Sequence, residues 1–462
     1  MPSEAKEWSV IFWSGVNTVT GANFMLEGQN VRILIDCGMV QGGSDSEKEN
    51  NKSFPYDPSS IDHLFVTHAH MDHVGRIPKL VKDGFHGKIY STPETKSLAK
   101  LMLANAAGIQ ESQSKERGAP PIFDKQDVDK SFVFWETIDY HQEKLINQSF
   151  SVRVLDAGHI LGSSMYEFVC KKEDGKSFKI VFTGDVGNSP SILLRDTEPI
   201  TGTDYLVMES VYGDRNHEPK EFRDRKFKEV VIDSIKNKGT LLIPAFSLER
   251  AQTILYELNK LIESAVIPKI PVFLDSPLAI ELTTIYESIT SLYNEKVRSE
   301  ISKGDDIFDF PRLKETARSW ESRKIFKTPN PKIIIAGSGM STAGRVLSHE
   351  KYVLPDKNST LLLVGYQAPG TLGREIQSGA KEVMIGDEIT KVNAQIITID
   401  GYSAHKDSDH LVEFVGESSS SIKGVFIVMG EPKSARFLAQ RLRDDVGVKA
   451  VTPEPAKTYP LS

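Results

Sequence analysis

Short runs of apolar residues recur along the chain, and each run ends in a polar or glycine-rich turn. Their length and their content of β-branched residues predict buried strands rather than helices. The predicted strands are residues 31–35, 64–67, 179–183, 205–208, 240–243, 271–274, 332–336, 361–364, 396–399 and 425–428. Helical patterns lie between several of them, most clearly at residues 247–262, where apolar residues recur at spacings of three and four. Strands that alternate with helices predict an α/β protein.

Polar residues directly follow several of these predicted strands. They are His68, Asp185, Glu209, Ser338 and His405. Because α/β folds build their sites at the carboxyl ends of strands, we expect these residues to occupy functional positions. The charged stretch at residues 286–327 has the weakest strand signal and predicts a peripheral cover. A chain of 462 residues is expected to form about two or three structural units.

The composition is that of an ordinary soluble globular protein, with 39% hydrophobic and 26% charged residues. The net charge of −7 gives no global positive field, so any contact with a polyanion must be local. No apolar run approaches the roughly 18 residues of a membrane span, and no signal peptide is visible. Cys37 and Cys170, the two cysteines, give no disulfide framework. These features predict a cytoplasmic protein with no membrane partner.

One cluster carries clear chemistry, the run His68-Ala69-His70-Met71-Asp72-His73, which follows the predicted strand at residues 64–67. A lone histidine is usually structural, but three histidines and an aspartate in one turn favour a metal site. Imidazole and carboxylate ligands suit zinc and similar divalent ions, and a site that keeps a water on the metal lowers the pKa of that water to about 7. Two further residues of ligand type, His159 and Asp185, each lie beside a glycine, where the backbone can approach a metal closely.

This arrangement resembles the metallo-β-lactamase superfamily, whose binuclear members carry an H-x-H-x-D-H run followed by a distant histidine and a distant aspartate. The resemblance implies two zinc ions. It implies that His68, His70 and His159 hold one metal, that Asp72 and His73 hold the second, and that Asp185 bridges both. Asp36 matches an early buried aspartate that orients the ligands from behind.

The stretch from about residue 213 to residue 392 exceeds what small-substrate members of the superfamily need. Here the chain resembles the β-CASP branch, the nucleases that include the 3′-end endonuclease of the cleavage and polyadenylation specificity factor and its prokaryotic relatives. The motifs that carry this resemblance lie at residues 208–215, 243–247, 274–278, 337–345, 365–374 and 403–407. The implied fold is an αββα sandwich formed by residues 1–209 and 393–462, with an α/β β-CASP domain inserted at residues 210–392.

Glycine-rich loops in the second half of the chain predict phosphate binding. The run Gly337-Ser338-Gly339-Met340-Ser341 follows a predicted strand, and its amides and hydroxyls can cradle a phosphate. Nearby arginines can clamp phosphate oxygens through paired hydrogen bonds. The predicted phosphate-binding residues are Ser338, Gly339, Ser341, Arg345, Arg374 and Ser403.

The resemblance also assigns catalytic roles. His405 would protonate the leaving oxygen, and Glu209 would orient its imidazole and keep it charged. Asp72 and Asp185 complete the implied catalytic set. A metal-bound hydroxide would attack the phosphorus of RNA while the metals neutralise developing charge.

One residue departs from the family pattern. RNA-processing members carry a histidine in a strand-end His-Gly-Glu, and that histidine completes the second metal site. This chain has Met429-Gly430-Glu431 at the matching position, and a thioether is a poor ligand for zinc. The second metal is therefore expected to bind more weakly.

The leading prediction is a zinc-dependent ribonuclease that cleaves single-stranded RNA, with an endonuclease favoured because no additional domain is recognisable at either end of the chain. Three alternatives remain open. The first is a DNA nuclease, since DNA-repair relatives also lack the histidine at the position of Met429. The second is a small-ester or thioester hydrolase, and the third is an inactive protein that binds RNA. A homodimer is also an open alternative to a monomer.

Overall fold

The computed structural model describes residues 7–42, 45–118, 120–368 and 370–462. Pro369, within the motif at residues 365–374, lies outside these ranges. The chain forms two compact units: the first comprises Met1–Asn216 and Ala404–Ser462, and the second comprises His217–Ser403. The domain limits predicted from the sequence lie 7 residues earlier at the first junction and 11 residues earlier at the second.

The first unit contains two mixed sheets. In spatial order, the first sheet is β22 (Thr458–Pro460), β1 (Ser9–Ser14), β2 (Asn23–Gly28), β3 (Val31–Ile35), β4 (His63–Phe65), β5 (Lys88–Ser91) and β6 (Trp135–Thr137). The second is β21 (Ala450–Val451), β20 (Gly424–Ile427), β11 (Tyr205–Met208), β10 (Ser177–Phe182), β9 (Ser164–Lys171), β8 (Phe150–Asp156) and β7 (Glu143–Leu145). In each sheet the strands at one side pair antiparallel and those at the other side pair parallel. The parallel parts are β3, β4, β5 and β6 in the first sheet and β10, β11, β20 and β21 in the second.

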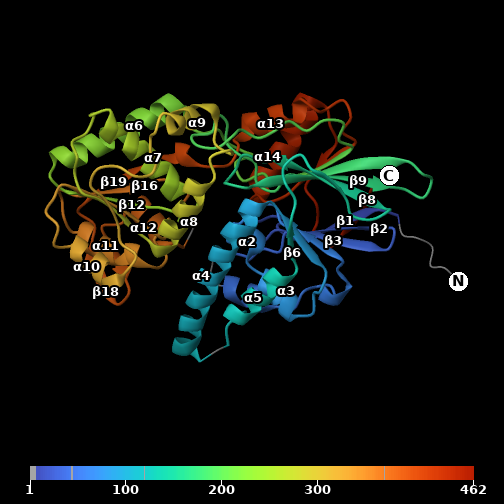
Figure 1. Cartoon of the computed structure of the whole chain (residues 1–462), viewed down its shortest axis with the longest axis horizontal. Helices are drawn as coiled ribbons and strands as arrows, with labels where there is room; N and C mark the ends of the chain where they lie inside the picture. The colour runs from blue at the N-terminus through green and yellow to red at the C-terminus, as the bar shows by residue number, and fades with distance from the viewer. Residues whose placement is uncertain (1–6, 43–44, 119, 369) are drawn as a thin grey trace. The chain divides into compact units, whose positions relative to one another are not determined.

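Helices cover the outer faces of both sheets. The helical segments of this unit are α1 (Ser46–Asn51), η1 (Pro58–Ser60), α2 (Met71–Val74), α3 (Ile77–Lys82), α4 (Pro93–Arg117), α5 (Lys125–Val133), α13 (Ser408–Gly416), α14 (Pro432–Arg441) and η3 (Leu442–Val446). Figure 1 shows α3, α4 and α5 on one side of the two sheets and α13 and α14 on the other. The αββα sandwich predicted from the sequence is therefore confirmed.

The apolar strands are explained by burial on both faces. In β11, Tyr205 and Val207 face the core between the sheets, whereas Leu206 and Met208 join the core that includes buried side chains of α13 and α14. Neighbouring side chains of a strand point to opposite faces, so each face of β11 contributes to a different core. Both cores fix the carboxyl end of β11, where Glu209 follows.

The second unit is built on a parallel sheet. In spatial order it is β14 (Leu313–Glu315), β13 (Val272–Asp275), β15 (Lys332–Ala336), β12 (Thr240–Pro244), β16 (Thr360–Leu363) and β19 (Gln395–Thr398). Its helical segments are α6 (Lys220–Lys236), α7 (Arg250–Glu263), α8 (Pro277–Ser288), α9 (Glu295–Ser302), α10 (Ser319–Ile325), α11 (Arg345–Val353), α12 (Leu372–Gln377) and η2 (Asp400–Tyr402). A hairpin of β17 (Glu382–Ile385) and β18 (Glu388–Lys391) completes it.

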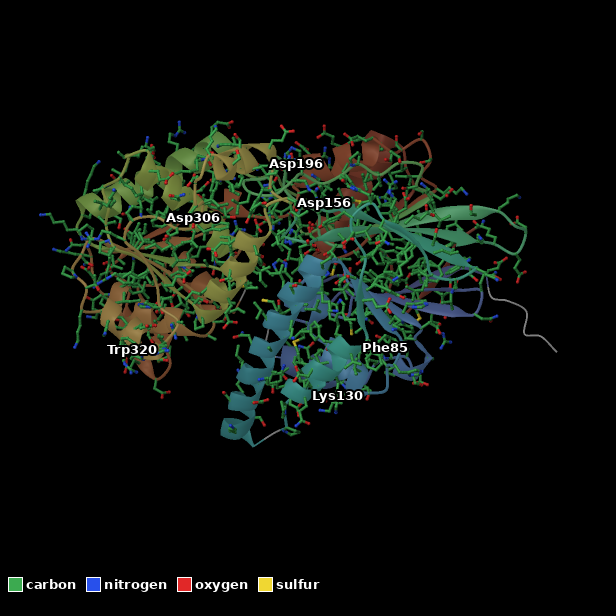
Figure 2. All side chains as sticks on the ribbon, viewed as in Figure 1. Phe85, Lys130, Asp156, Asp196, Asp306 and Trp320 are labelled. Atoms are coloured by element: carbon green, nitrogen blue, oxygen red, sulfur yellow. The ribbon has the colours of Figure 1, made fainter. Side chains whose placement is uncertain are left out.

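Two details of this unit differ from the sequence predictions. Strand β19 pairs with β16, so residues 395–398 belong to this sheet, whereas the predicted boundary after residue 392 assigns them to the other domain. The charged stretch at residues 286–327 contains α9 and α10, and it also contributes β14 at the edge of the sheet. The side chain of Trp320, on α10, is half-exposed at the surface (Figure 2). The helix predicted at residues 247–262 is confirmed as α7.

Within the described ranges, none of the helices combines the length and apolarity that a membrane crossing requires.

The core between the two sheets should set the stability of the first unit. The fully buried ring of Phe65 lies 5.0 Å from the ring centroids of Tyr90 and Phe168. We expect Phe65→Ala to lower the free energy of unfolding by about 3–5 kcal/mol, because it removes a large ring from a packed core. Chemical denaturation of the purified variant measures this loss. The control is Phe437→Ala on α14, where the ring is 46% exposed and the change should be small. Equal losses in the two variants would contradict this account of the core.

Candidate metal and catalytic site

The turn that follows β4 positions the histidine cluster. His70 is the N-cap residue of α2 in an extended conformation, and Asp72 and His73 lie in that short helix. The Asp72 carbonyl accepts a hydrogen bond from the Ala22 amide at 2.9 Å, and the His73 carbonyl accepts one from Cys37 at 2.8 Å. These backbone contacts fix the direction in which the cluster's side chains point.

A glycine makes this close packing possible. A Cβ atom at Gly38 would lie 1.5 Å from the carbonyl oxygen of Asp72, so no other residue fits beside this turn. The early strands β2 and β3 therefore hold the turn through the segments that adjoin them.

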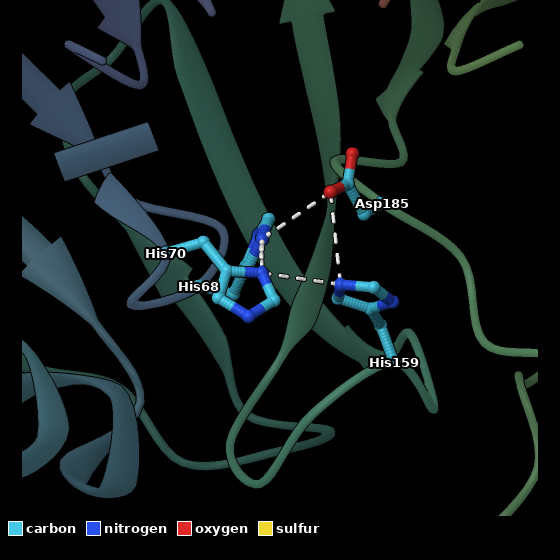
Figure 3. A group of neighbouring side chains, drawn as sticks. All are labelled: His68, His70, His159 and Asp185. Carbon is cyan, nitrogen blue, oxygen red and sulfur yellow. Dashed lines mark hydrogen bonds and ion pairs between the residues drawn. The ribbon is translucent and has the colours of Figure 1, made fainter. Parts of the chain in front are cut away.

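Four side chains converge in the first ligand group, His68, His70, His159 and Asp185 (Figure 3). Nε2 of His68 lies 3.1 Å from Nδ1 of His70, and Nε2 of His159 lies 3.3 Å from the same Nδ1. Oδ2 of Asp185 lies 3.4 Å from Nε2 of His68 and 3.6 Å from Nε2 of His159. Three imidazoles and a carboxylate at such spacing form a donor set suited to zinc.

The second ligand group comprises Asp72, His73 and Asp185. Nε2 of His73 lies 3.4 Å from Oδ2 of Asp185 and 3.9 Å from Oδ2 of Asp72. This nitrogen and Oδ1 of Asp185 are buried, yet neither forms a hydrogen bond with any residue that the structure describes. Buried polar atoms normally have partners, so these two atoms fit a group that binds a metal. Asp185 is the residue that the two groups share.

Asp36 supports the second group from behind. Its Oδ2 atom lies 2.7 Å from Nδ1 of His73, on the opposite side of the ring from Asp185. The same carboxylate accepts hydrogen bonds from the amide and the hydroxyl of Thr67, both at 2.8 Å. A carboxylate in this position fixes the orientation of the imidazole and leaves Nε2 directed at the site.

Burial makes two of the imidazoles neutral. It lowers the pKa of His70 well below the usual value, and the neighbouring His68 lowers it further. Burial likewise lowers the pKa of His159 well below the usual value, with a further contribution from His405. A neutral imidazole is the form that binds a metal, so these two side chains are ready to act as ligands.

For His73 and Asp185, neighbouring charges shift the pKa in the direction opposite to burial. Burial alone would lower the pKa of His73, but Asp185 and Asp36 raise it well above the usual value. Burial alone would raise the pKa of Asp185, but His73 and His405 hold it well below the usual value. In the metal-free protein a proton on His73 therefore balances the buried carboxylates, and metal binding would displace that proton.

A second acid–base pair lies beside the histidines. Nδ1 of His405 lies 2.9 Å from Oε1 of Glu209, and the His405 ring centroid lies 4.6 Å from that of His159. Glu209 is fully buried, and its Oε1 atom accepts a hydrogen bond from the Val186 amide at 2.8 Å. Burial would lower the pKa of His405, but Glu209 and Asp185 raise it to about 9. His405 is therefore protonated near neutral pH.

Comparisons with known proteins show the family of this chain. The chain matches the family models for the metallo-beta-lactamase superfamily domain at residues 25–202, the Beta-Casp domain at residues 251–376 and the Zn-dependent metallo-hydrolase RNA specificity domain at residues 389–453. It is 32% identical to Ribonuclease TTHA0252 of Thermus thermophilus over 94% of this chain and 95% of that protein.

The chain belongs to the β-CASP branch of the metallo-β-lactamase superfamily.

One longer curated protein and one solved structure are also similar to this chain. Transcription termination factor FttA of Pyrococcus horikoshii is 32% identical, and the match covers 87% of this chain but only 62% of that longer protein. A crystal structure of an Enterococcus faecalis protein of unknown function covers 98% of this chain with a TM-score of 0.57. At 14% identity that structure shows a shared fold alone.

The predicted phosphate-binding residues of the β-CASP insert have mixed surroundings. Nη1 of Arg345 donates to Oδ1 of Asp275 at 2.7 Å, and Nη2 donates to the Ala317 carbonyl at 2.7 Å. The buried hydroxyl of Ser341 donates to the Glu350 carboxylate. Arg345 and Ser341 are therefore held by internal contacts, and phosphate binding by these two residues stays a prediction.

The other four predicted phosphate-binding residues have surroundings that neither support nor oppose a phosphate contact. Arg374 is exposed, and the Ser338 hydroxyl lies 2.9 Å from the hydroxyl of Thr342. Gly339 packs so closely on Phe246 that a Cβ atom would lie 2.8 Å from its ring. The Ser403 amide donates to the Asp400 carbonyl at 3.4 Å. Phosphate binding by Ser338, Gly339, Arg374 and Ser403 stays a prediction.

A polar network that the sequence motifs do not indicate supports the segment of His159. Asp156 ends β8 (Figure 2), and its carboxylate lies 2.7 Å from Nη2 of Arg195. The same carboxylate accepts a hydrogen bond from the Gly158 amide at 2.9 Å. Burial raises the pKa of Asp156 to about 6, although Arg195 opposes the shift. Asp156 lies near the predicted ligand His159 in the sequence. Its partner Arg195 lies 39 residues away, so the sequence gives no sign of their contact.

Met429 occupies an apolar position. Its side chain is buried in the core between the sheets, and a Cβ atom at Gly15 would lie 2.9 Å from its sulfur. Its amide donates to the Gly15 carbonyl at 2.8 Å. In the described part of the chain, the second ligand group thus contains Asp72, His73 and Asp185 without a further histidine.

Glu209 should control the protonation of His405. In the metal-free protein we expect the His405 imidazole to titrate with a pKa of about 9. Glu209→Gln removes the carboxylate that stabilises the imidazolium, so the pKa should fall and the ring should lose its proton at lower pH. NMR titration of histidine-labelled protein measures both values. The control is Glu198→Gln, which removes the carboxylate 2.6 Å from a different histidine, His141, and should leave the His405 titration unchanged. An unchanged His405 titration in Glu209→Gln would show that Glu209 does not set its charge.

Proposed function

We propose that this chain is a zinc-dependent ribonuclease that cleaves single-stranded RNA at internal phosphodiester bonds. The observation that carries the proposal is the placement of the His405–Glu209 pair directly beside two buried ligand groups that share Asp185. A proton donor next to a divalent metal site is the combination that phosphodiester hydrolysis requires. Endonucleolytic cleavage, the identity of the metal, a cytoplasmic location and a homodimer remain predictions.

The ligand groups fit zinc by their chemistry. His68, His70, His159 and Asp185 would hold one ion, and Asp72 and His73 would hold the second together with Asp185. Bound metal would supply Lewis-acid chemistry, since it acidifies water and neutralises the charge that develops on a phosphate. Nitrogen and oxygen donors of this kind also accept other divalent ions, so the ligand types favour zinc without excluding them.

The protein's own residues account for the remaining steps. His405, charged because Glu209 faces its Nδ1 atom, would donate a proton to the oxygen that leaves phosphorus. Glu209 stays in place because the Val186 amide and the buried end of β11 hold it. Asp36 would keep His73 directed at the site throughout the reaction.

The similar proteins favour RNA among the substrates that this chemistry permits. One relative that the chain matches almost end to end is named a ribonuclease, and residues 389–453 match a domain described by RNA specificity. A small-ester hydrolase would have no need for the His405–Glu209 pair. RNA is therefore the substrate proposed, and DNA is the alternative that the assay must exclude.

Cleavage of labelled nucleic acid tests this proposal directly. Zinc-loaded protein should convert single-stranded RNA labelled at either end into internal fragments, and a chelator should stop the reaction. Single-stranded DNA and a chromogenic ester serve as rival substrates. Asp185→Asn should lose metal and reduce RNA cleavage by at least the roughly 10–100-fold that supporting residues of metal sites cost. Metal content by mass spectrometry and initial rates measure the two effects.

The matched control is Asp174→Asn, in the exposed turn between β9 and β10, which should retain both metal and activity. Faster cleavage of DNA or of the ester than of RNA would overturn the proposed substrate. Full activity of Asp185→Asn would overturn the proposed site.

Met429 allows a test of the second metal. We expect Met429→His to raise the bound metal towards two ions per chain, because imidazole is a far better zinc ligand than a thioether. Met429→Leu is the matched control, since it keeps an apolar side chain and should leave the metal content unchanged. Equilibrium dialysis followed by elemental analysis provides the measurement. Equal metal contents in the two variants would remove Met429 as the reason for a weak second site.

A further inference from the structure

Tyr212 lies between the proposed proton donor and an arginine to which no role has been assigned. The Tyr212 ring centroid lies 6.3 Å from that of His405, with the ring planes tilted by 34°. The guanidinium carbon of Arg215 lies 4.5 Å from the Tyr212 centroid. All three residues belong to the first unit. Arg215 therefore lies close to the proposed active site, with the Tyr212 ring between it and His405.

The backbone holds this arrangement in register. Tyr212 forms an isolated parallel bridge with Asp407, and the Arg215 carbonyl accepts a hydrogen bond from the Ser408 amide at 3.1 Å. The Arg215 amide donates in turn to the Tyr212 carbonyl at 3.2 Å. The segment that carries Arg215 is thus fixed to the segment that carries His405, and a movement of one would move the other.

Two exposed cations share one carboxylate in this segment. Nη1 of Arg215 lies 2.9 Å from Oδ1 of Asp214, and Nζ of Lys433 lies 3.0 Å from the other oxygen of that carboxylate. The Arg215 side chain is 45% exposed, whereas that of Asp214 is 9% exposed. Among these three residues, one largely buried carboxylate faces two accessible cations, so the trio carries one excess positive charge. Such a local charge can attract a polyanion although the whole chain is acidic.

The shape of the arginine also suits a phosphate. A guanidinium has five N–H donors in a rigid fork, and among the described residues Asp214 is the side chain that Arg215 pairs with. Contact with the face of Tyr212 restricts the side chain before any ligand binds, which reduces the entropy lost on binding. Arg345, the arginine first expected to clamp a phosphate, is occupied by Asp275.

We propose that Arg215 binds the RNA phosphate adjacent to the scissile one, with Tyr212 as its positioning residue. This inference rests on the proposed ribonuclease function and deepens it. The contact would fix the register of the strand, so that the bond to be cut lies at His405. The enzyme should therefore prefer a substrate that carries a second phosphate next to the scissile one.

Short substrates can isolate this contact. The zinc-loaded enzyme is assayed on a dinucleoside monophosphate and on the matching trinucleotide, which adds one neighbouring phosphate. We expect the wild type to prefer the trinucleotide in kcat/KM, and Arg215→Gln to reduce that preference by about tenfold, as for the loss of one charge-assisted hydrogen bond. Most of the change should lie in KM. Arg215→Lys keeps the charge and should retain part of the preference.

Salt dependence gives a second measurement that a merely structural arginine would not affect. For single-stranded RNA, the slope of log kcat/KM against log salt should become shallower by about 0.7 in Arg215→Gln, the value for one lost phosphate contact. The control is Lys176→Gln in the turn before β10, where an 80% exposed cation is removed far from this segment in sequence. Thermal unfolding of each variant confirms that it is folded.

The outcomes separate the two proposals. If the wild type cleaves RNA, and Arg215→Gln retains both the trinucleotide preference and the salt slope, the role of Arg215 is refuted and the ribonuclease function stands. Equal effects in Arg215→Gln and Lys176→Gln would also refute it, since they indicate a nonspecific effect of charge. If the wild type cleaves no RNA, the proposed function itself fails.

Discussion

The site depends on the burial of one carboxylate, that of Asp185. Its charge lies in the interior among the imidazoles of His68, His73, His159 and His405, all within 4.0 Å of its Oδ2 atom. A buried charge is costly unless it is paired, and here the pairing without metal is partial because Oδ1 forms no hydrogen bond with a described residue. A divalent cation would complete it. The same carboxylate raises the pKa of His73 and of His405, so metal binding and the protonation of both rings are linked.

The fold brings the candidate ligands together from several strand ends at once. His68 and His70 follow β4 of one sheet, whereas His159 and Asp185 follow β8 and β10 of the other. Glu209 follows β11, and its neighbours along that strand are fixed by the two cores on either face of the second sheet. Packing between the sheets therefore determines how far apart the ligands lie, and loss of that packing would disperse them.

The sequence predicted which side chains lie together in the two candidate ligand groups, because most of their chemistry is local. Three histidines and an aspartate within one turn after a strand indicate a metal site without knowledge of distant contacts, and the absence of a histidine at Met429 could be read directly. Arg345 shows where such reasoning stops. Its partner Asp275 lies 70 residues away, and nothing near Arg345 in the sequence indicates that its donors are occupied. For the same reason Arg215 was overlooked, since its proximity to His405 arises only when residues 212–215 pair with residues 407–408. Strand β19 was predicted, but its assignment to a sheet depended on pairing with β16.

Anomalous diffraction from zinc-soaked crystals would test the central claim most directly. The account predicts one strong zinc peak within bonding distance of His68, His70, His159 and Asp185, and a weaker peak beside Asp72 and His73 that shares Asp185. The absence of a peak at Asp185 under saturating zinc, or a peak bound elsewhere while these side chains keep their metal-free contacts, would contradict it.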